Sequence, residues 1–319
     1  MLPRETTTIQ HRPCGDTGLV VSDLGLGTLT WGRDTDAHEA VDMLTSFVGA
    51  GGTLVECSPL DGDGHAVDVL AAGLSAVGRH RVTLAWRGGA RWTPAGTVPA
   101  SAARGALLDS LDDSLSRLGT DHVDVWMATP AAHIPLEETL SALEYALSSG
   151  RTRYVGLANT DLWDISRAHW AGTRGGVPIS VVADEFSLLH CVASEELRGR
   201  VADNGMGFFA HAPLAGGVLT GKYRHTTPPD SRAASDHLRY LVLHHIQHGR
   251  GIVEAVARAA EGLERTTAAV ALAWVRGTPG VASAIIGPRS LRQLEPHLEA
   301  PATLPSPIRA VLDEVAGLA

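Results

Sequence analysis

The sequence predicts a (β/α)8 barrel of the TIM type, with a β-hairpin before it and extra helices at its C-terminal end. Short apolar segments alternate along almost the whole chain with longer segments whose apolar residues recur at helical spacing. Continuous apolar strands that alternate with amphipathic helices are typical of a parallel sheet covered by helices. Eight such units in 319 residues favour one closed barrel domain, spanning 1–319, over an open sheet.

The elements follow from turns, apolar runs and helical periodicity. A turn at 15–18 between two extended runs predicts a hairpin over 12–22. Apolar runs predict strands at 24–28, 53–56, 81–86, 123–128, 153–157, 179–183, 206–210 and 282–286. Helical spacing predicts helices at 37–50, 65–77, 102–118, 136–149, 161–170, 194–204, 250–263, 266–276, 290–298 and 306–317. The segment 225–250, rich in His, Pro and Ser, is expected to form a mobile loop over the pocket or an interface.

Composition excludes several classes of protein. A formal charge of −9 without any basic run argues against a nucleic-acid-binding surface. No apolar run reaches the roughly 18–20 residues of a membrane span, and the first residues lack a signal-peptide core. Three widely spaced cysteines fit neither a disulfide framework nor a metal site, which favours the cytoplasm. A small-molecule substrate is the expected partner, and the oligomeric state stays open.

Polar residues stand at the C-terminal ends of the predicted strands, which share one face in such a barrel. Glu56 ends a buried strand, and Asp61 follows five residues later in a loop rich in Gly and Asp. The residues expected at this mouth are Glu56, Arg87, Thr129, Asn159, Asp184 and His211. We therefore expect the chemistry of this protein at the mouth of the barrel.

Several segments together resemble the aldo-keto reductase family of NADPH-dependent (β/α)8-barrel oxidoreductases. They lie at 18–32, 115–124, 153–159 and 185–189, and the longest match is Ala-Pro-Leu-Ala-Gly-Gly-Val-Leu-Thr-Gly-Lys-Tyr at 212–223. The resemblance covers almost the whole chain and implies the barrel fold. It also implies a tyrosine proton donor helped by a lysine, an aspartate and a histidine.

All four of these implied positions differ here. The resemblance places Glu56 at the aspartate, Asp61 at the tyrosine and Arg87 at the lysine. The segment around Thr129 holds no histidine where the family has one. Asp61 beside Arg87 is expected to be ionised and to act as a base. One arginine cannot neutralise two carboxylates, so the pKa of either Glu56 or Asp61 should rise.

The implied cofactor contacts are partly replaced. The family's serine, glutamine and stacking aromatic residue around the nicotinamide are here Ala158, Ala183 and His211. If NADPH binds, the resemblance assigns it to Asn159, Leu214, Gly216, Lys222, Arg289 and Gln293. We therefore expect no cofactor, with NADPH as the alternative.

The first hypothesis is non-redox acid–base chemistry, such as dehydration, isomerisation or cyclisation. The expected substrate is a small metabolite that bears a carbonyl group, with or without an aromatic ring. Glu56 and Asp61 are the expected acid and base, Arg87 holds an oxyanion, and Thr129 helps to shape the site. The remaining residues assigned to the pocket are Trp31, Trp86, Trp126, Asp184 and His211. The alternatives are an NADPH-dependent reductase with an unusual proton donor, and a non-catalytic binding protein in which Glu56 and Arg87 form an inert ion pair.

Overall fold

The computed structural model describes residues 9–89, 91–93, 96–98 and 101–318. Within them, eight parallel strands close into a barrel in the order β10-β11-β12-β3-β4-β5-β8-β9. The strands are Leu24–Gly27 (β3), Leu54–Cys57 (β4), Thr83–Arg87 (β5), Val123–Ala128 (β8), Thr152–Ala158 (β9), Val181–Glu185 (β10), Gly207–His211 (β11) and Val281–Ile286 (β12). The predicted closed barrel is confirmed, and every predicted strand overlaps one of these.

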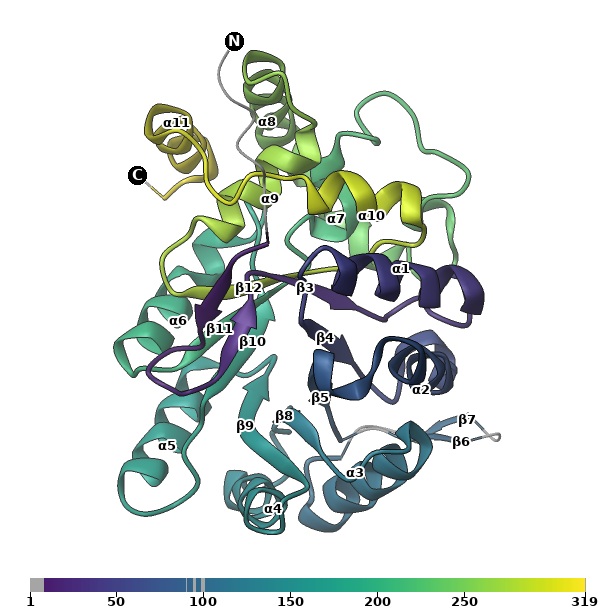
Figure 1. Cartoon of the computed structure of the whole chain (residues 1–319). Coiled ribbons are helices and arrows are strands. Elements are labelled where there is room, and N and C mark those ends of the chain that lie inside the picture. The colour runs from purple at the N-terminus through teal and green to yellow at the C-terminus, as the bar shows by residue number, and fades with distance from the viewer. Residues whose placement is uncertain (1–8, 90, 94–95, 99–100, 319) are drawn as a thin grey trace.

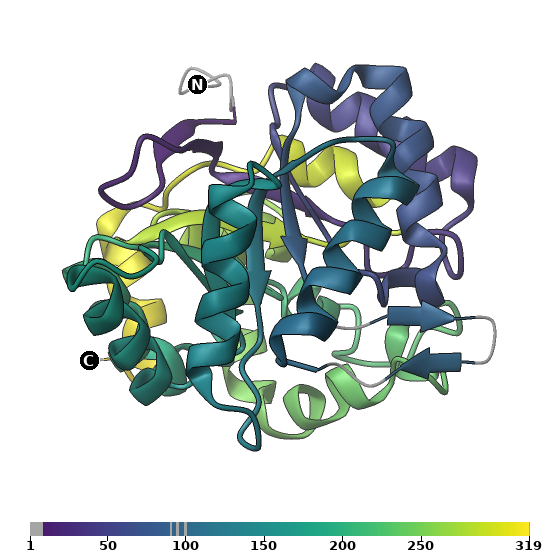
Figure 2. The ribbon, with the colours of Figure 1, turned by 90° about the horizontal axis from the view of Figure 1, so that it is seen from below.

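Helices surround the ring of strands, as Figure 1 shows, and Figure 2 shows the same ribbon turned by 90° about the horizontal axis. They are Ala37–Gly49 (α1), Ala66–Val77 (α2), Arg104–Leu118 (α3), Leu136–Ser148 (α4), Leu162–Thr173 (α5), Cys191–Asp203 (α6), Tyr240–His248 (α7), Arg250–Gly262 (α8), Thr267–Arg276 (α9), Leu291–Leu298 (α10) and Ser306–Ala316 (α11). All the predicted helices are present. None of the helices in the described part of the chain combines the length and apolar character needed to cross a bilayer.

Two antiparallel hairpins accompany the barrel. The predicted one pairs His11–Pro13 (β1) with Val20–Ser22 (β2), and its residues pack into the same buried cluster as the inward side chains of the strands. A second hairpin, Arg91–Thr93 (β6) with Gly96–Val98 (β7), was absent from the prediction and projects beside the barrel in Figure 2. Strand β6 lies against the short 3-10 helix η1 (Asp61–Gly64), which carries a predicted catalytic residue.

The strands divide their side chains between two buried layers, because successive residues of a strand face opposite ways. The interior of the barrel holds Leu54, Ala85, Val125, Met127, Ala183 and Phe209. The layer between the strands and the helices holds Val55, Leu84, Trp86, Trp126, Val182 and Phe208. Trp86 and Trp126 are fully buried in this outer layer, which corrects the prediction that they line the substrate pocket.

A buried ion pair lies next to the N-terminal end of β3, opposite the mouth of the barrel. The guanidinium of Arg276, at the end of α9, donates to both carboxylate oxygens of Asp23 at 2.9 Å. The side chains of Asp23 and Arg276 are 0% and 1% exposed, so neither charge is screened by water. Arg12 of the hairpin adds a second cation, 3.2 Å from Asp23.

The segment 225–250 differs from the predicted loop. It contains a 3-10 turn, Arg232–Ala234 (η4), and helix α7, which contacts η3 (Ala215–Thr220) and α8. Val242 of α7 is fully buried, and His245 is 3.0 Å from a carboxylate oxygen of Glu185 at the end of β10. Buried packing and this contact hold α7 against the mouth of the barrel.

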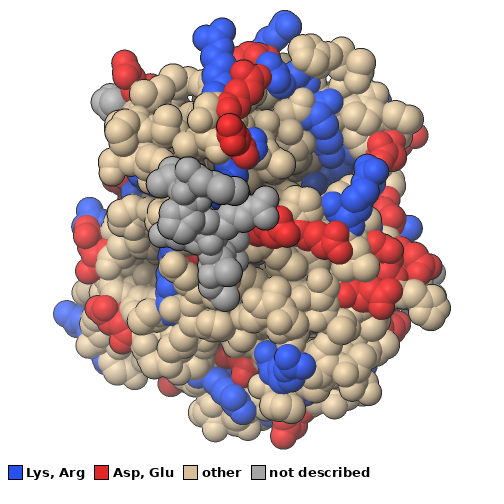
Figure 3. All heavy atoms as spheres, turned by 45° about the horizontal axis from the view of Figure 1, so that its top comes forward, with Lys and Arg blue, Asp and Glu red and all other residues tan. Residues whose placement is uncertain are grey.

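The surface carries both signs of charge. On the face seen in Figure 3, acidic and basic side chains are interspersed and separated by wide areas of other residues. This distribution agrees with the formal charge of −9 and offers no extended basic surface on that face.

Candidate active site

Three charged side chains meet at the mouth of the barrel. Arg87, the last residue of β5, directs its Nε at Oε1 of Glu56 on β4. Its Nη2 lies 3.6 Å from Oδ1 of Asp61. From across the mouth, at the end of β11, Nε2 of His211 lies 3.1 Å from the same Glu56 oxygen. The sequence-predicted residues Glu56, Asp61, Arg87 and His211 are thus brought together.

The loop after β4 holds the Asp61 side chain in place. Its Oδ2 accepts hydrogen bonds from the Thr28 hydroxyl at 2.8 Å and from the Ser58 backbone N–H at 3.1 Å. The next residue, Gly62, has a φ of 57°, and a Cβ there would lie 1.8 Å from the carbonyl oxygen of Trp31. Only glycine fits so close to that backbone, which fixes the loop and therefore Asp61.

The environment separates the pKa values of the two carboxylates. Burial would raise the pKa of Glu56, but the charge of Arg87 and the contact with His211 outweigh it and lower this pKa to about 2. Burial raises the pKa of Asp61 above its ordinary value, and the nearby negative charge of Glu56 adds to the rise. Glu56 is therefore the ionised partner of Arg87, and Asp61 is the carboxylate better suited to exchange a proton.

The ion pair of Glu56 gives a testable pH dependence of stability. We expect Glu56→Gln to lower the free energy of unfolding at pH 7 by roughly 3 kcal/mol, because the pKa falls from 4.5 to about 2 on folding. A carboxylate with a lowered pKa stabilises the fold above pH 4.5, and this contribution disappears as the pH falls toward 2. Urea unfolding of both proteins at several pH values measures the difference.

Glu137→Gln is the matched control, because Glu137 forms an exposed ion pair with Arg167 at the surface. Little change is expected there, since exposed ion pairs contribute little to stability. A Glu56→Gln effect that stays constant from pH 7 to pH 2 would contradict the assigned ionisation of Glu56.

Other predicted residues lie near the cluster without joining it. Thr129 follows β8, and by strand alternation it shares the inward face with Met127; no hydrogen bond links it to the cluster within the described residues. Trp31 is fully buried, and its indole N–H has no partner among them. Asp184 accepts a hydrogen bond from the Glu185 N–H at 2.7 Å, and burial raises its pKa.

A second charged group consists of Lys222, Arg232 and Arg289. We call it the cation cluster. Burial lowers the pKa of Lys222 to about 8, and the charges of Arg232 and Arg289 add to this effect. Arg232 donates to the carbonyl oxygens of Gly216 and Gly287, at 3.0 Å each, and so joins the loop after β11 to the end of β12. Throughout the described ranges, none of the three cations has a carboxylate within ion-pair distance, so the cluster is suited to an anion.

Arg232 is the site residue that sequence reasoning missed. It lies in the segment expected to be a loop, and no neighbouring motif distinguishes it from other arginines of the chain. Only the fold brings it to this site, because the turn η4 lies against η3 and Arg232 donates to the carbonyl oxygen of Gly216 there.

The other residues that the resemblance assigns to a cofactor differ from one another in burial and in hydrogen bonding. The Gln293 side chain accepts a hydrogen bond from the Arg289 N–H at 2.9 Å and so shapes the loop of the cation cluster. Gly216 has a φ of 65°, and a Cβ there would meet Val242 of α7 at 2.4 Å. Leu214 directly precedes η3, and Asn159 is exposed after β9 with a φ of 50°. No group of His, Cys, Asp and Glu in the described part of the chain is arranged to hold a metal ion.

Comparison with known proteins places this geometry in a family. The model of the aldo/keto reductase family matches residues 23–309. The chain belongs to the aldo/keto reductase family. It is similar to two plant proteins, from Arabidopsis thaliana and Oryza sativa subsp. japonica, each described as a probable voltage-gated potassium channel subunit beta. Each is 28% identical over 320 residues, which cover 96% of this chain and 95% of the relative.

Members of the aldo/keto reductase family use NADPH, and this chain fits that cofactor only at one end. The cation cluster offers unpaired positive charge for phosphate groups. Ala158 and Ala183, which the resemblance assigns to the nicotinamide end, are fully buried and carry no polar group. The His211 ring is held by Glu56. The cation cluster therefore suits phosphate groups, whereas Ala158 and Ala183 offer no side-chain hydrogen bond.

Proposed function

We propose that this member of the aldo/keto reductase family catalyses non-redox acid–base chemistry on a small carbonyl compound at the mouth of its barrel. Glu56, Asp61 and Arg87 take the places of the family's aspartate, tyrosine and lysine. The observation that carries the proposal is that the two carboxylates differ in their surroundings. Glu56 is paired with Arg87, which lowers its pKa, whereas burial raises the pKa of Asp61.

In this proposal each residue has one task. Asp61 removes a proton from the carbon next to the carbonyl group and returns it to the product. Arg87, with 28% of its side chain exposed, hydrogen-bonds the substrate oxygen and stabilises the negative charge that develops there. Arg87 cannot supply the proton itself, because its pKa lies above any relevant pH. Glu56 and His211 position the guanidinium.

Exchange of substrate hydrogen for deuterium tests this proposal without any added nucleotide. The protein is incubated in D2O with a panel of small aldehydes, ketones and 2-oxo acids, and the C–H signals next to each carbonyl are followed by NMR. We expect deuterium to enter at least one compound faster with the native protein than with Asp61→Asn. Equal rates for both proteins across the panel would refute the proposal and leave NADPH-dependent reduction or a non-catalytic binding function.

NADPH-dependent reduction is a second candidate, and the cation cluster is the observation that favours it. Bound NADPH would supply a hydride, with its phosphates held by Lys222, Arg232 and Arg289. We expect Arg289→Gln to weaken NADP⁺ binding about tenfold or more, because a charged hydrogen bond is lost. Calorimetry measures the affinity, and Arg292→Gln, an exposed arginine three residues later, is the control. If the native protein binds no NADP⁺, this candidate is excluded.

A further inference from the structure

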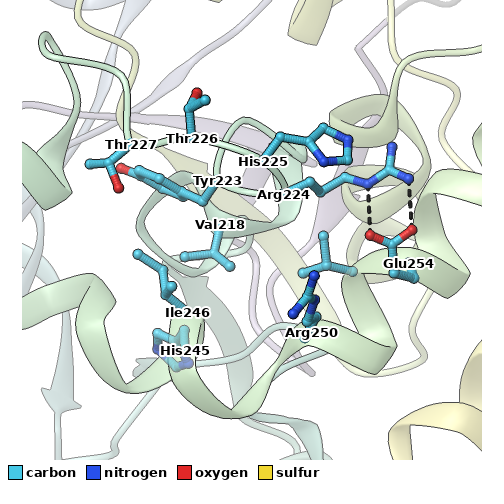
Figure 4. Close-up of a pocket in the computed structure, with 11 residues that line it drawn as sticks. Val218, Tyr223, Arg224, His225, Thr226, Thr227, His245, Ile246, Arg250 and Glu254 are labelled. Carbon is cyan, nitrogen blue, oxygen red and sulfur yellow. Dashed lines mark hydrogen bonds and ion pairs between the residues drawn. The ribbon is translucent and has the colours of Figure 1, made fainter.

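One pocket is lined by none of the residues Glu56, Asp61, Arg87 and His211. It opens between the segment 223–227 and the helices α7 and α8, and its volume is about 430 Å³. Figure 4 shows Tyr223, Thr226 and Thr227 on one side, facing Ile246 and other residues of the two helices across the opening. Pockets that bind small molecules begin at about 300 Å³, so its size suits a ligand of one ring or a short chain.

The floor of this pocket is apolar. Val218 of η3 and Val253 of α8 line it and are 3% and 6% exposed, and Ile246 of α7 is also part of the lining. The Tyr223 ring adds an aromatic surface, and its outer hydroxyl accepts the N–H of Ala233 at 3.3 Å. A ligand therefore gains most by placing hydrocarbon or an aromatic ring against this floor.

Among the described residues that line the pocket, the two arginines Arg224 and Arg250 outnumber the single carboxylate Glu254. Arg224 forms two hydrogen bonds to the carboxylate of Glu254, at 2.9 and 2.6 Å, so these two charges neutralise each other. His245 is paired with Glu185. The side chain of Arg250, at the opening, forms no hydrogen bond or ion pair with any residue that the structure describes, although its charge helps to lower the pKa of Glu254. Thr226 and Thr227 present hydroxyl groups on the opposite wall.

We propose that this pocket is a binding site for a small organic anion with an apolar body, such as an aromatic carboxylate. The apolar body lies on Val218, Ile246 and Val253, and the anionic group pairs with Arg250. The site is independent of the acid–base chemistry at Glu56 and Asp61, because it shares none of those residues.

Calorimetry on the whole protein tests this site with benzoate and with benzamide, its neutral analogue of the same shape. We expect benzoate to bind about tenfold more tightly than benzamide, because only benzoate forms a charge-assisted hydrogen bond. Arg250→Gln should reduce benzoate affinity about tenfold and leave benzamide unchanged. Arg258→Gln removes an exposed arginine elsewhere on α8 and should change neither affinity.

Two further variants separate this pocket from the cation cluster. Ile246→Trp fills the pocket and should abolish binding of both compounds, whereas Arg289→Gln should leave both affinities unchanged. The proposal is overturned if neither compound binds, if benzoate and benzamide bind equally, or if Arg289→Gln rather than Arg250→Gln removes benzoate binding.

Discussion

Replacement of Asp61 by asparagine is expected to lower kcat/KM for the acid–base reaction by about 10²–10⁴-fold, the usual contribution of a positioned proton-transfer group. The amide keeps the size of the side chain and can still accept the hydrogen bonds from Thr28 and Ser58. It cannot exchange a proton. The loss should therefore fall on kcat, and the rate of deuterium exchange into a substrate found in the panel measures it.

Asp63→Asn is the matched control for this variant. Asp63 lies in the same short helix η1, but its side chain is 61% exposed and pairs with Arg33 at the surface. It should keep the native rate. If both variants keep the native rate, Asp61 has no part in proton transfer. If both lose activity equally, the shape of the loop rather than the carboxylate matters.

Removal of the Asp23 carboxylate is expected to destabilise the fold by about 3–5 kcal/mol, since it leaves a buried guanidinium without its counter-charge. In Asp23→Ala, Arg276 keeps its hydrogen bond to the Ala300 carbonyl at 2.7 Å but loses all three of its hydrogen bonds to the carboxylate. The free energy of unfolding from urea titration measures the loss.

Two comparisons test whether the unpaired buried charge of Arg276 causes the loss of stability in Asp23→Ala. Asp112→Ala breaks an ion pair with Arg151 in which the aspartate is 54% exposed, and exposed pairs contribute about 0–1 kcal/mol. The double variant Asp23→Leu with Arg276→Met removes both buried charges and should recover much of the stability lost in Asp23→Ala. Equal losses for Asp23→Ala and Asp112→Ala would contradict this account.

The barrel could be predicted from the sequence because each of its strands and most of its helices have a clear local residue pattern. Apolar runs such as 123–128 are too short for buried helices, and the helices between them carry regular apolar stripes. Helix α7 gives no such signal. It has nine residues, three of them histidines, and only Val242 is a buried anchor. Its position depends on contacts with η3 that a local pattern cannot reveal.

The candidate site could be predicted in part. Strand ends bring Glu56, Arg87 and His211 to one mouth, and this convergence follows from the barrel alone. Strand alternation could also have predicted that Trp86 does not line the pocket. It is next to Arg87 on β5, so its side chain must face the helices when Arg87 faces the barrel interior. Which carboxylate pairs with Arg87 depends on distances between three elements, and the sequence therefore leaves it open.

The most direct test of the central claim is an NMR titration of the side-chain carboxyl carbons, with Asp61→Asn and Glu56→Gln used to assign the two signals. We expect Asp61 to titrate above the ordinary aspartate value of 3.8 and Glu56 to titrate near 2. This result would support Asp61 as the residue that exchanges a proton and Glu56 as the ionised partner of Arg87. If Asp61 titrates below 3.8 while Glu56 titrates above its ordinary 4.5, the two assigned roles are wrong.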